Sequence, residues 1–335
     1  MNAQSNVVIK RRGQSNISRT IWNNIVWILL IFAIVIMGLI DPVFFNVRTL
    51  MNIFVQGSIL GILAVAIGFS LLIAEIDLSI VGIAALSACL GTLAMSHGLN
   101  WILAILMIVF SGIIMGVING LLIAKLKAVS LIATLAFQIT YLGAVMAITQ
   151  GQSIINFPLE YKFIGQGRLF STAGAGESGF PIVIIVFLLV FLAVHYVWTR
   201  TAFGRSLYAI GGNAASAKVS GIKVDKVKII AFTVCGGLAG FAGFVLSSYM
   251  GAVTNTFGEQ YKMYSIAAAV IGGVSLSGGK GTVFGVLGGT LLLQVMQIGL
   301  QVLGISSYSV NMIGGLMILV AVIIDAFRNR LGEAK

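Results

Sequence analysis

Long apolar runs separated by short polar segments dominate the chain. A helix needs roughly 20 apolar residues to cross the hydrocarbon of a bilayer, and most of the runs approach that length. The pattern therefore predicts an all-α integral membrane protein with about ten transmembrane helices, some of them broken or short. The ten runs cover residues 25–40, 50–74, 78–95, 101–124, 129–148, 181–198, 227–250, 263–276, 283–302 and 308–327.

Ten runs divide into two halves of five, and because five is odd the second half enters the membrane from the opposite side. The fourth and ninth runs are equivalent in such an inverted repeat, and each carries three glycines at four-residue spacing, which puts them on one helix face and lets a neighbouring helix pack closely. Glycine is common in membrane helices, so chance is a competing explanation. The two trios are Gly112, Gly116 and Gly120, and Gly281, Gly285 and Gly289.

The composition supports a membrane protein and gives no sign of a soluble enzyme. Hydrophobic residues make up 59% of the 335 residues and charged residues 9%, whereas soluble domains are about a quarter charged. The 20 basic residues exceed the 9 acidic ones, but most of them flank apolar runs, so membrane topology explains them better than a nucleic-acid partner. Cys89 and Cys235 lie inside apolar runs and the two histidines stand apart, so no metal site is expected.

The basic residues also predict the orientation, because loops rich in Lys and Arg stay in the cytoplasm. If both termini are cytoplasmic, only four of the 20 basic residues lie outside, and the remaining 16 lie inside. The four are Arg48, Lys162, Arg168 and Lys262. We expect a multi-pass protein of the cell (inner or plasma) membrane with a single transmembrane domain over residues 21–327. The remaining segments are cytoplasmic tails at 1–20 and 328–335, a cytoplasmic loop at 199–228 and an external loop at 149–180.

The cytoplasmic loop at 199–228 is the one long polar stretch. Its pattern predicts two short helices, residues 203–208 and 214–220, separated by a turn at Gly211 and Gly212. Asn213 is expected to cap the start of the second helix and Gly221 to end it. Its outward face would present small side chains, those of Asn213, Ala214, Ala217 and Ser220. A soluble partner could dock there, although a solvated basic loop is the alternative interpretation.

Acidic residues precede the third and eighth runs, which are the other equivalent pair. Broken helices at matching positions are where a polar pathway can cross a membrane, since their free backbone groups need polar partners. The alternative is that Asp77 only caps the following helix through Ser79 or its neighbours. The candidate pathway residues are Glu75, Asp77, Ser79, Glu259 and Tyr264.

Three motifs occur along the chain. In order they are EIDLSIVG, GRSLYAIGGNAASAKVSGIKVDKVK and IAAAVIGGVSLSGGKGTVFG. Together they resemble the permease subunits of ATP-driven sugar importers of the ribose type. The resemblance implies an ABC ATPase subunit, an extracytoplasmic sugar-binding protein and a second permease copy as partners, besides the lipid bilayer. It also implies an ATPase-coupling role for Gly204, Arg205, Gly211, Gly212, Asn213, Ala217, Ser220 and Gly221.

The resemblance has departures that leave the sugar open. Glu75 and Val81 replace glycines of the usual GIDLSVG motif, and Lys262 and Tyr264 stand where the family often carries two acids. No contact with a particular sugar can therefore be transferred to this chain.

The segment 277–282, SGGKGT, lacks the spacing of a phosphate-binding loop. We therefore expect no enzyme activity and no cofactor in this chain, with ATP bound by a partner subunit. The alternatives are a branched-chain amino acid ABC permease and an ATP-independent secondary transporter. The latter usually needs ionisable groups within the membrane, and the apolar runs hold almost none.

Overall fold

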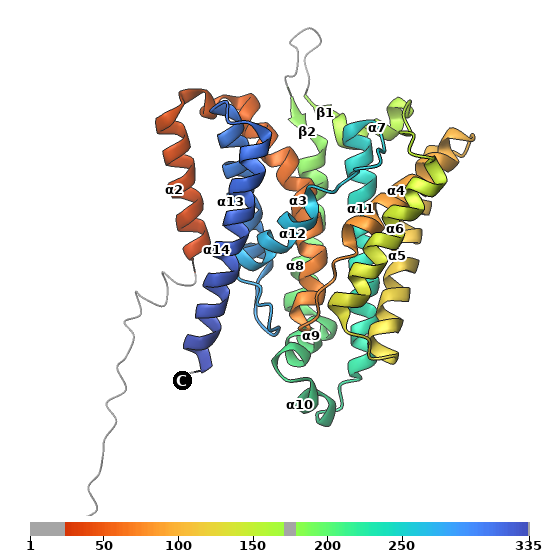
Figure 1. Ribbon diagram of the computed structural model, residues 1–335, viewed down its shortest axis with the longest axis vertical. Coiled ribbons are helices and arrows are strands. Elements are labelled where there is room, and N and C mark those ends of the chain that lie inside the picture. The colour runs from red at the N-terminus through yellow and green to blue at the C-terminus, as the bar shows by residue number, and fades with distance from the viewer. Residues whose placement is uncertain (1–23, 171–178, 334–335) are drawn as a thin grey trace, which may run out of the picture.

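The structure is a computed structural model that describes residues 24–170 and 179–333. Helices account for almost all of the described chain, and Figure 1 shows most of them aligned with one direction. The helices are α2 (Ile25–Ile40), the 3-10 helix η1 (Pro42–Phe45), α3 (Val47–Leu72), α4 (Ile80–Ser96), α5 (Trp101–Lys125), α6 (Ser130–Thr149), α7 (Leu159–Gln166), α8 (Ile182–Arg200), α9 (Ala202–Gly212), α10 (Ala214–Val219), α11 (Val224–Met250), α12 (Tyr261–Ile271), α13 (Val283–Val302) and α14 (Ser307–Glu333).

The helices confirm the all-α membrane architecture. Six of them are long and apolar enough to cross a membrane: α3, α5, α6, α8, α11 and α13. Four shorter apolar helices, α2, α4, α12 and the 307–320 part of α14, correspond to the remaining predicted runs. The last of these helices, α14, continues to Glu333, past the end of the tenth predicted run at residue 327.

Side-chain caps set where several of these helices begin. Asn46, Asn100 and Thr282 precede α3, α5 and α13, and each accepts a hydrogen bond from a backbone N–H in the first turn. At the other end of α11, Gly251 adopts a φ of 67°, a left-handed conformation that glycine allows without a steric penalty. The only strands in the described residues, β1 (Arg168–Leu169) and β2 (Phe180–Pro181), pair antiparallel between α7 and α8.

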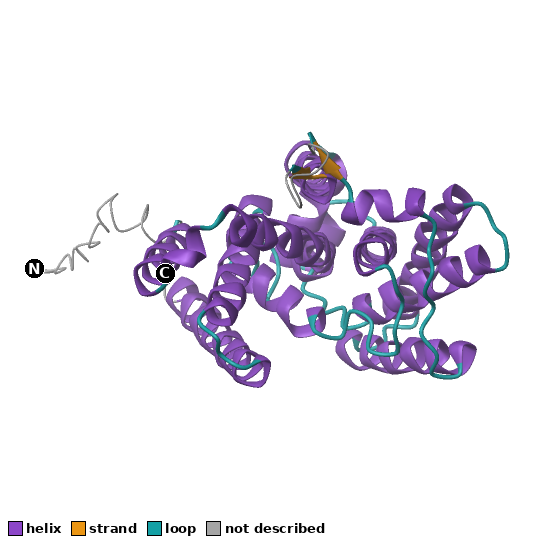
Figure 2. Cartoon of the chain, turned by 90° about the horizontal axis from the view of Figure 1, so that it is seen from above, coloured by secondary structure: helices purple, strands orange, loops and turns teal. Residues whose placement is uncertain are grey.

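The core is formed by helices that are surrounded by other helices. α3, α11 and α13 are buried over most of their apolar length, whereas α5, α6 and α8 leave most of theirs exposed. Figure 2 looks along the helices and shows them spread in an elongated arrangement, with the small sheet at one edge. Exposed apolar side chains on the outer helices are the surface that faces lipid in a membrane protein.

Helices α5 and α11 approach each other through glycine. A Cβ atom added to Gly112 would lie 2.5 Å from the carbonyl oxygen of Gly236, and one added to Gly116 would lie 2.4 Å from that of Phe232. Gly120 packs in the same way against the backbone of Ile229. This predicted trio therefore lines the contact with α11, where missing side chains bring the two backbones together.

The second predicted trio divides between two elements. Gly285 and Gly289 lie on α13 and face α12, where an added Cβ would approach the carbonyl oxygens of Gly272 and Ala268 to 1.9 and 2.1 Å. Gly281 precedes α13 and has a φ of 146°, so it does not continue that helix face as expected. It belongs to the loop of residues 272–282, which we call the glycine loop.

Two interruptions break the helical pattern. Residues 73–79 separate α3 from α4, and residues 251–260 separate α11 from α12; we call them the first break and the second break. Figure 1 shows the first break leaving the lower end of α3 and the second leaving the upper end of α11. Breaks at equivalent positions and opposite ends are what an inverted pair of five-helix halves requires.

The glycine contact between α5 and α11 makes a direct prediction. We expect Gly116→Leu to lower the free energy of unfolding by about 1–3 kcal/mol, because the leucine side chain must displace the α11 backbone. Thermal unfolding of the purified protein in detergent measures the effect. Gly143→Leu on α6 is the matched control, since nothing lies within 4 Å of a Cβ at Gly143. Equal unfolding temperatures for the two variants would contradict this packing.

Candidate functional site

Two short helices, α9 and α10, project from the end of α8 and form the lowest folded part of the molecule in Figure 1. Thr201 caps α9 by accepting from the N–H of Gly204 at 3.0 Å, and Asn213 caps α10 by accepting from the N–H of Ser216 at 2.9 Å. Gly221 follows α10 with a φ of 85°. Two helices are therefore present with the predicted residues Asn213 and Gly221 at the ends of the second. The predicted turn at Gly211 and Gly212 is wrong, because α9 continues through Gly212 and only Asn213 separates the two helices.

The predicted coupling residues divide into an exposed and a buried set. Those at the surface are Arg205, Gly212, Asn213, Ser220 and Gly221. Nothing lies within 4 Å of a Cβ built at Gly212, so this part of the backbone is open to a partner. Ala217 is 4% exposed and packs inward, which corrects the expectation that it belongs to the outward face. Gly204 is also buried, under the carbonyl groups of Val197 and Trp198.

Gly211 lies where α9 meets two other parts of the chain. A Cβ at this position would be 1.9 Å from the carbonyl oxygen of Leu72, at the end of α3, and 2.3 Å from the nitrogen of Gly279 in the glycine loop. The same Leu72 oxygen accepts a hydrogen bond from Gly279 N at 2.9 Å. We call this meeting point of α3, α9 and the glycine loop the junction.

A second bond ties α9 to the glycine loop. The hydroxyl of Tyr208 donates to the carbonyl oxygen of Gly281 at 2.9 Å. Burial raises the pKa of the Tyr208 hydroxyl, so it stays a neutral donor at physiological pH. This bond is therefore a second contact between α9 and the glycine loop, which continues directly from α12.

Side chains of α6 accept hydrogen bonds from the first break and from the first turn of α4. Backbone N–H groups inside a membrane protein need partners within the protein, and α6 supplies them from one face. Ser130 accepts from Ile76 at 3.3 Å, Thr134 from Leu78 at 3.0 Å, and Gln138 from Gly82 at 2.7 Å. Our sequence reasoning missed these three, although their spacing of four residues within an apolar run is a readable signal.

Asp77 is fully buried at the end of the first break. Its Oδ1 accepts from the N–H and the hydroxyl of Ser79 at 2.9 and 2.5 Å, and Asn119 on α5 donates to the same hydroxyl at 2.6 Å. Oδ2 has no hydrogen-bond partner among the described residues. This arrangement is compatible with the alternative in which Asp77 caps α4 through Ser79, although the side chain of Ser79 itself makes no capping bond to the helix.

The side chain of Glu75 extends from the first break toward α11. Its carboxylate forms an ion pair with Lys228 of α11, and both side chains are mostly buried. The first break is therefore tied to α6 by backbone hydrogen bonds and to α11 by charge. These bonds fix the position of the break relative to the α5–α11 pair.

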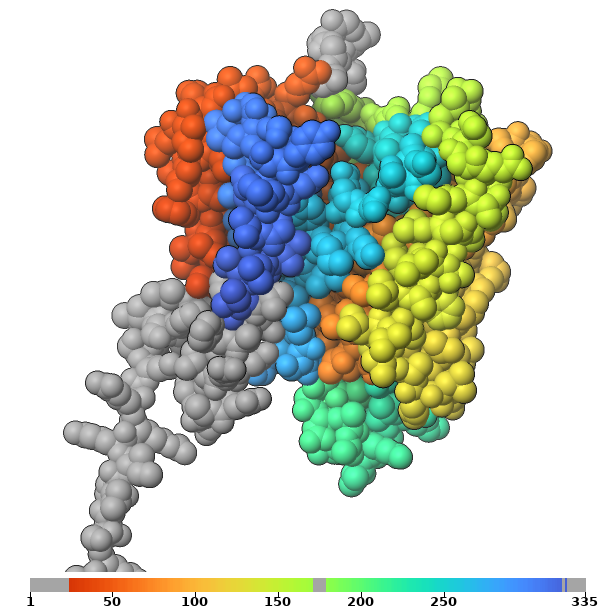
Figure 3. Space-filling model, in the orientation of Figure 1, coloured from red at the N-terminus to blue at the C-terminus, as the bar shows by residue number. Residues whose placement is uncertain are grey.

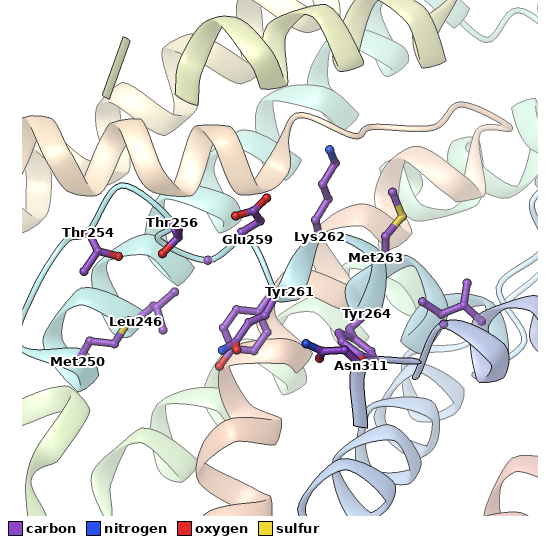
Figure 4. Close-up of a pocket in the computed structure, with 14 residues that line it drawn as sticks. Leu246, Met250, Thr254, Thr256, Glu259, Tyr261, Lys262, Met263, Tyr264 and Asn311 are labelled. Carbon is purple, nitrogen blue, oxygen red and sulfur yellow. The ribbon is translucent and has the colours of Figure 1, made fainter. Parts of the chain in front are cut away.

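The second break borders an open cavity of about 690 Å³. Of the predicted pathway residues, Glu259 and Tyr264 line it together, while Glu75, Asp77 and Ser79 do not. The polar groups around it include hydroxyls, two amides, a carboxylate and an ammonium. Figure 4 shows labelled polar side chains that come from the second break, α12 and α14. The polar lining residues that our sequence reasoning did not assign to a pathway are Thr254, Thr256, Gln260, Tyr261, Lys262 and Asn311.

The buried contacts of Asp77 yield a stability prediction. We expect Asp77→Ala to lower stability by about 1–3 kcal/mol, because Ser79 loses the acceptor for its buried N–H. Asp77→Asn keeps that acceptor and removes the buried charge, so it should remain close to wild type. Thermal unfolding in detergent compares the pair, and an alanine variant as stable as the asparagine variant would contradict the capping role.

Comparison with known proteins gives relatives that cover most of the chain. The ribose import permease of Haemophilus influenzae is 38% identical over 310 residues, which is 92% of this chain and 94% of the relative. That of Escherichia coli K12 is 35% identical over 89% of this chain and 92% of its own length. The autoinducer 2 import permease of Yersinia pseudotuberculosis YPIII is 33% identical over 89% of this chain and 82% of its own.

No solved structure gives a significant match. A family model described as the permease component of branched-chain amino acid transport systems matches residues 49–321, from the start of α3 into α14. This range includes both breaks, the glycine loop, and α9 with α10. The chain therefore belongs to this family of membrane permease components.

Proposed function

We propose that the chain is the membrane-spanning subunit of an ATP-binding cassette importer and forms the pathway for a ribose-like monosaccharide or a related small polyol. The observation that carries the proposal is the junction, where the exposed α9–α10 segment contacts both α3 and the glycine loop through Gly211. A partner that moves this segment therefore acts directly on the elements that border the helix breaks. Ribose import permeases that align with nine-tenths of the chain support the same assignment.

The coupling step is a displacement of α9 by an ATPase. The exposed backbone at Gly212 and the side chain of Asn213 enter a cleft of the ATPase, which closes when it binds ATP. Through Tyr208 and Gly211 the displacement reaches the glycine loop and α12, which carries Tyr261 and Tyr264 into the cavity. Through Leu72 it reaches the first break. Interfaces this tightly packed transmit a shift as a change between discrete arrangements.

The cavity at the second break suits a polyhydroxy solute. Tyrosine offers an apolar ring face together with a hydroxyl, and Tyr261 and Tyr264 both line the cavity. The threonine hydroxyls and the Asn311 amide can donate and accept hydrogen bonds, as sugar hydroxyls require. Small-molecule sites commonly combine apolar walls with a few such polar groups.

The proposal includes partners and an orientation. ATP is bound and hydrolysed by a separate ABC ATPase subunit, because 277–282 lacks a phosphate-binding loop. An extracytoplasmic sugar-binding protein delivers the solute, and a second permease copy completes the pathway. The α9–α10 segment and both chain ends face the cytoplasm, in agreement with the basic residues around them.

An ATP-independent transporter would need ion coupling, usually through charged groups inside the membrane. Here the mostly buried Glu75 forms an ion pair with Lys228, and Asp77 accepts hydrogen bonds from Ser79. The family description mentions branched-chain amino acids, whereas the relatives quoted above are permeases for ribose and autoinducer 2. These observations favour an ATP-driven sugar importer.

Reconstitution tests the proposal as a whole. We expect proteoliposomes containing the permease, its ATPase and its binding protein to accumulate a labelled pentose only when ATP is present on the ATPase side. The ATPase alone should not move the sugar, and leucine should not replace it. Uptake that continues without the ATPase and follows an ion gradient would overturn the importer assignment.

The exposed backbone at Gly212 gives a docking test. Because the surroundings are open, we expect Gly212→Trp to fold and insert normally but to reduce ATP-driven uptake at least tenfold, by keeping the ATPase cleft from closing around α9 and α10. Gly212→Ala should lose less. Gly143→Trp on the exposed face of α6 is a control of equal size. Unchanged uptake in Gly212→Trp would contradict docking at this point.

A further inference from the structure

A second pocket lies at the α10 end of the molecule. It has a volume of about 840 Å³ and is bounded by the end of α5, the connection to α6, α10 and the start of α11. In Figure 3 the α9–α10 segment (green) lies directly below the surface formed by α5 and α6 (yellow). Six lysines line this space, which we call the basic pocket: Lys125, Lys127, Lys218, Lys223, Lys226 and Lys228.

The charges of the basic pocket are only partly neutralised. Asp225 is the one acidic residue in its lining and pairs with Lys127 at 2.6 Å, and Lys228 is paired with Glu75. The other four lysines are exposed, and within the described chain no carboxylate lies within 4 Å of them. Like charges gathered in one concave surface attract an anion.

One ion pair links two sides of the pocket. Lys127 has a φ of 56°, a left-handed conformation that is unfavourable for a residue with a side chain. Its solvent-exposed ion pair with Asp225 joins the α5–α6 connection to the first turn of α11. The basic pocket therefore contains a residue with a strained backbone, a feature found at binding sites.

Apolar side chains continue from the lysines along the membrane-facing surface. Leu126 and Val129, in the connection itself, are 73% and 63% exposed, and Ile132 in the first turn of α6 is 67% exposed. The pocket thus lies where the apolar spans α5, α6 and α11 end, at the level of lipid headgroups. A ligand that matches this surface has an anionic head and an apolar tail.

We propose that the basic pocket binds the headgroup of an anionic phospholipid, with its acyl chains against the exposed side chains of Leu126, Val129 and Ile132. Basic pockets between membrane helices are suited to such headgroups, and each lysine near the surface adds attraction. Of the proposed ATPase contacts, Gly212 and Asn213 lie outside the lining, but Gly221 belongs to it, as do residues of α10. The site therefore adjoins the docking contact, and ATPase association is measured alongside lipid binding.

Native mass spectrometry of the purified full chain tests the proposal. With equal amounts of phosphatidylglycerol and phosphatidylcholine in the detergent, we expect wild type to bind the anionic lipid at least tenfold more tightly. Lys125→Gln/Lys226→Gln should lose about 25-fold of that affinity, at roughly fivefold per lysine. Arg200→Gln/Lys280→Gln removes the same charge from exposed residues at the same end and should bind like wild type.

Each other outcome contradicts the proposal. Equal losses in the two double variants would mean that only the overall charge of this end matters. A pocket variant that keeps its preference for phosphatidylglycerol but no longer associates with the ATPase would make the pocket a protein contact. Binding of inorganic phosphate, with no preference between the two lipids, would make it a site for a free anion.

Discussion

The fold depends on supplying hydrogen bonds to backbone that leaves the helical conformation inside an apolar environment. Every unsatisfied backbone group there costs several kcal/mol. The first break meets this requirement with side chains of α6, and the end of α3 meets it with the bond between Leu72 O and Gly279 N. Because Gly279 belongs to the glycine loop, this bond places the end of α3 against that loop.

This arrangement separates rigid from adjustable parts. The glycine contacts of α5 with α11 and of α13 with α12 bring backbones so close that these pairs cannot separate without losing their packing. The first break is the more adjustable part, since individual hydrogen bonds and one ion pair, each of modest net value, hold it. The junction belongs with the rigid parts, because Gly211 brings backbones as close together as the helix pairs do. The junction is therefore where a displacement of α9, as proposed, would reach Leu72 and the first break.

Much of the fold follows from the sequence alone. Apolar run length fixes the number of helices, because hydrocarbon thickness leaves little choice, and α2 and α13 begin and end at the predicted residues. The caps of α9 and α10 follow from local hydrogen bonding by residues such as Asn213. Sequence reasoning failed where tertiary contacts decide which side chains are buried. Alanine has no preference for either face of a six-residue helix, so the burial of Ala217 could not be read from it.

The candidate sites show the same limit. Glu259 and Tyr264 were found because they flank an interruption in the pattern, but Asn311 joins them from α14, nearly fifty residues later. The basic pocket likewise combines Lys125 with lysines about a hundred residues away. The sequence shows such residues as ordinary loop charges or as polar positions in an apolar run. Only the packing of α5, α6 and α11 brings the lysines together.

Hydrogen–deuterium exchange of the permease in nanodiscs, with and without its ATPase, tests most directly whether the junction links the α9–α10 segment to the first break and to the glycine loop. The account predicts that ATPase binding and ATP-driven closure change exchange in α9 and α10 and, at the same time, in residues 73–79 and 272–282. A change confined to α9 and α10, with both of those segments unaffected in every nucleotide state, would contradict it.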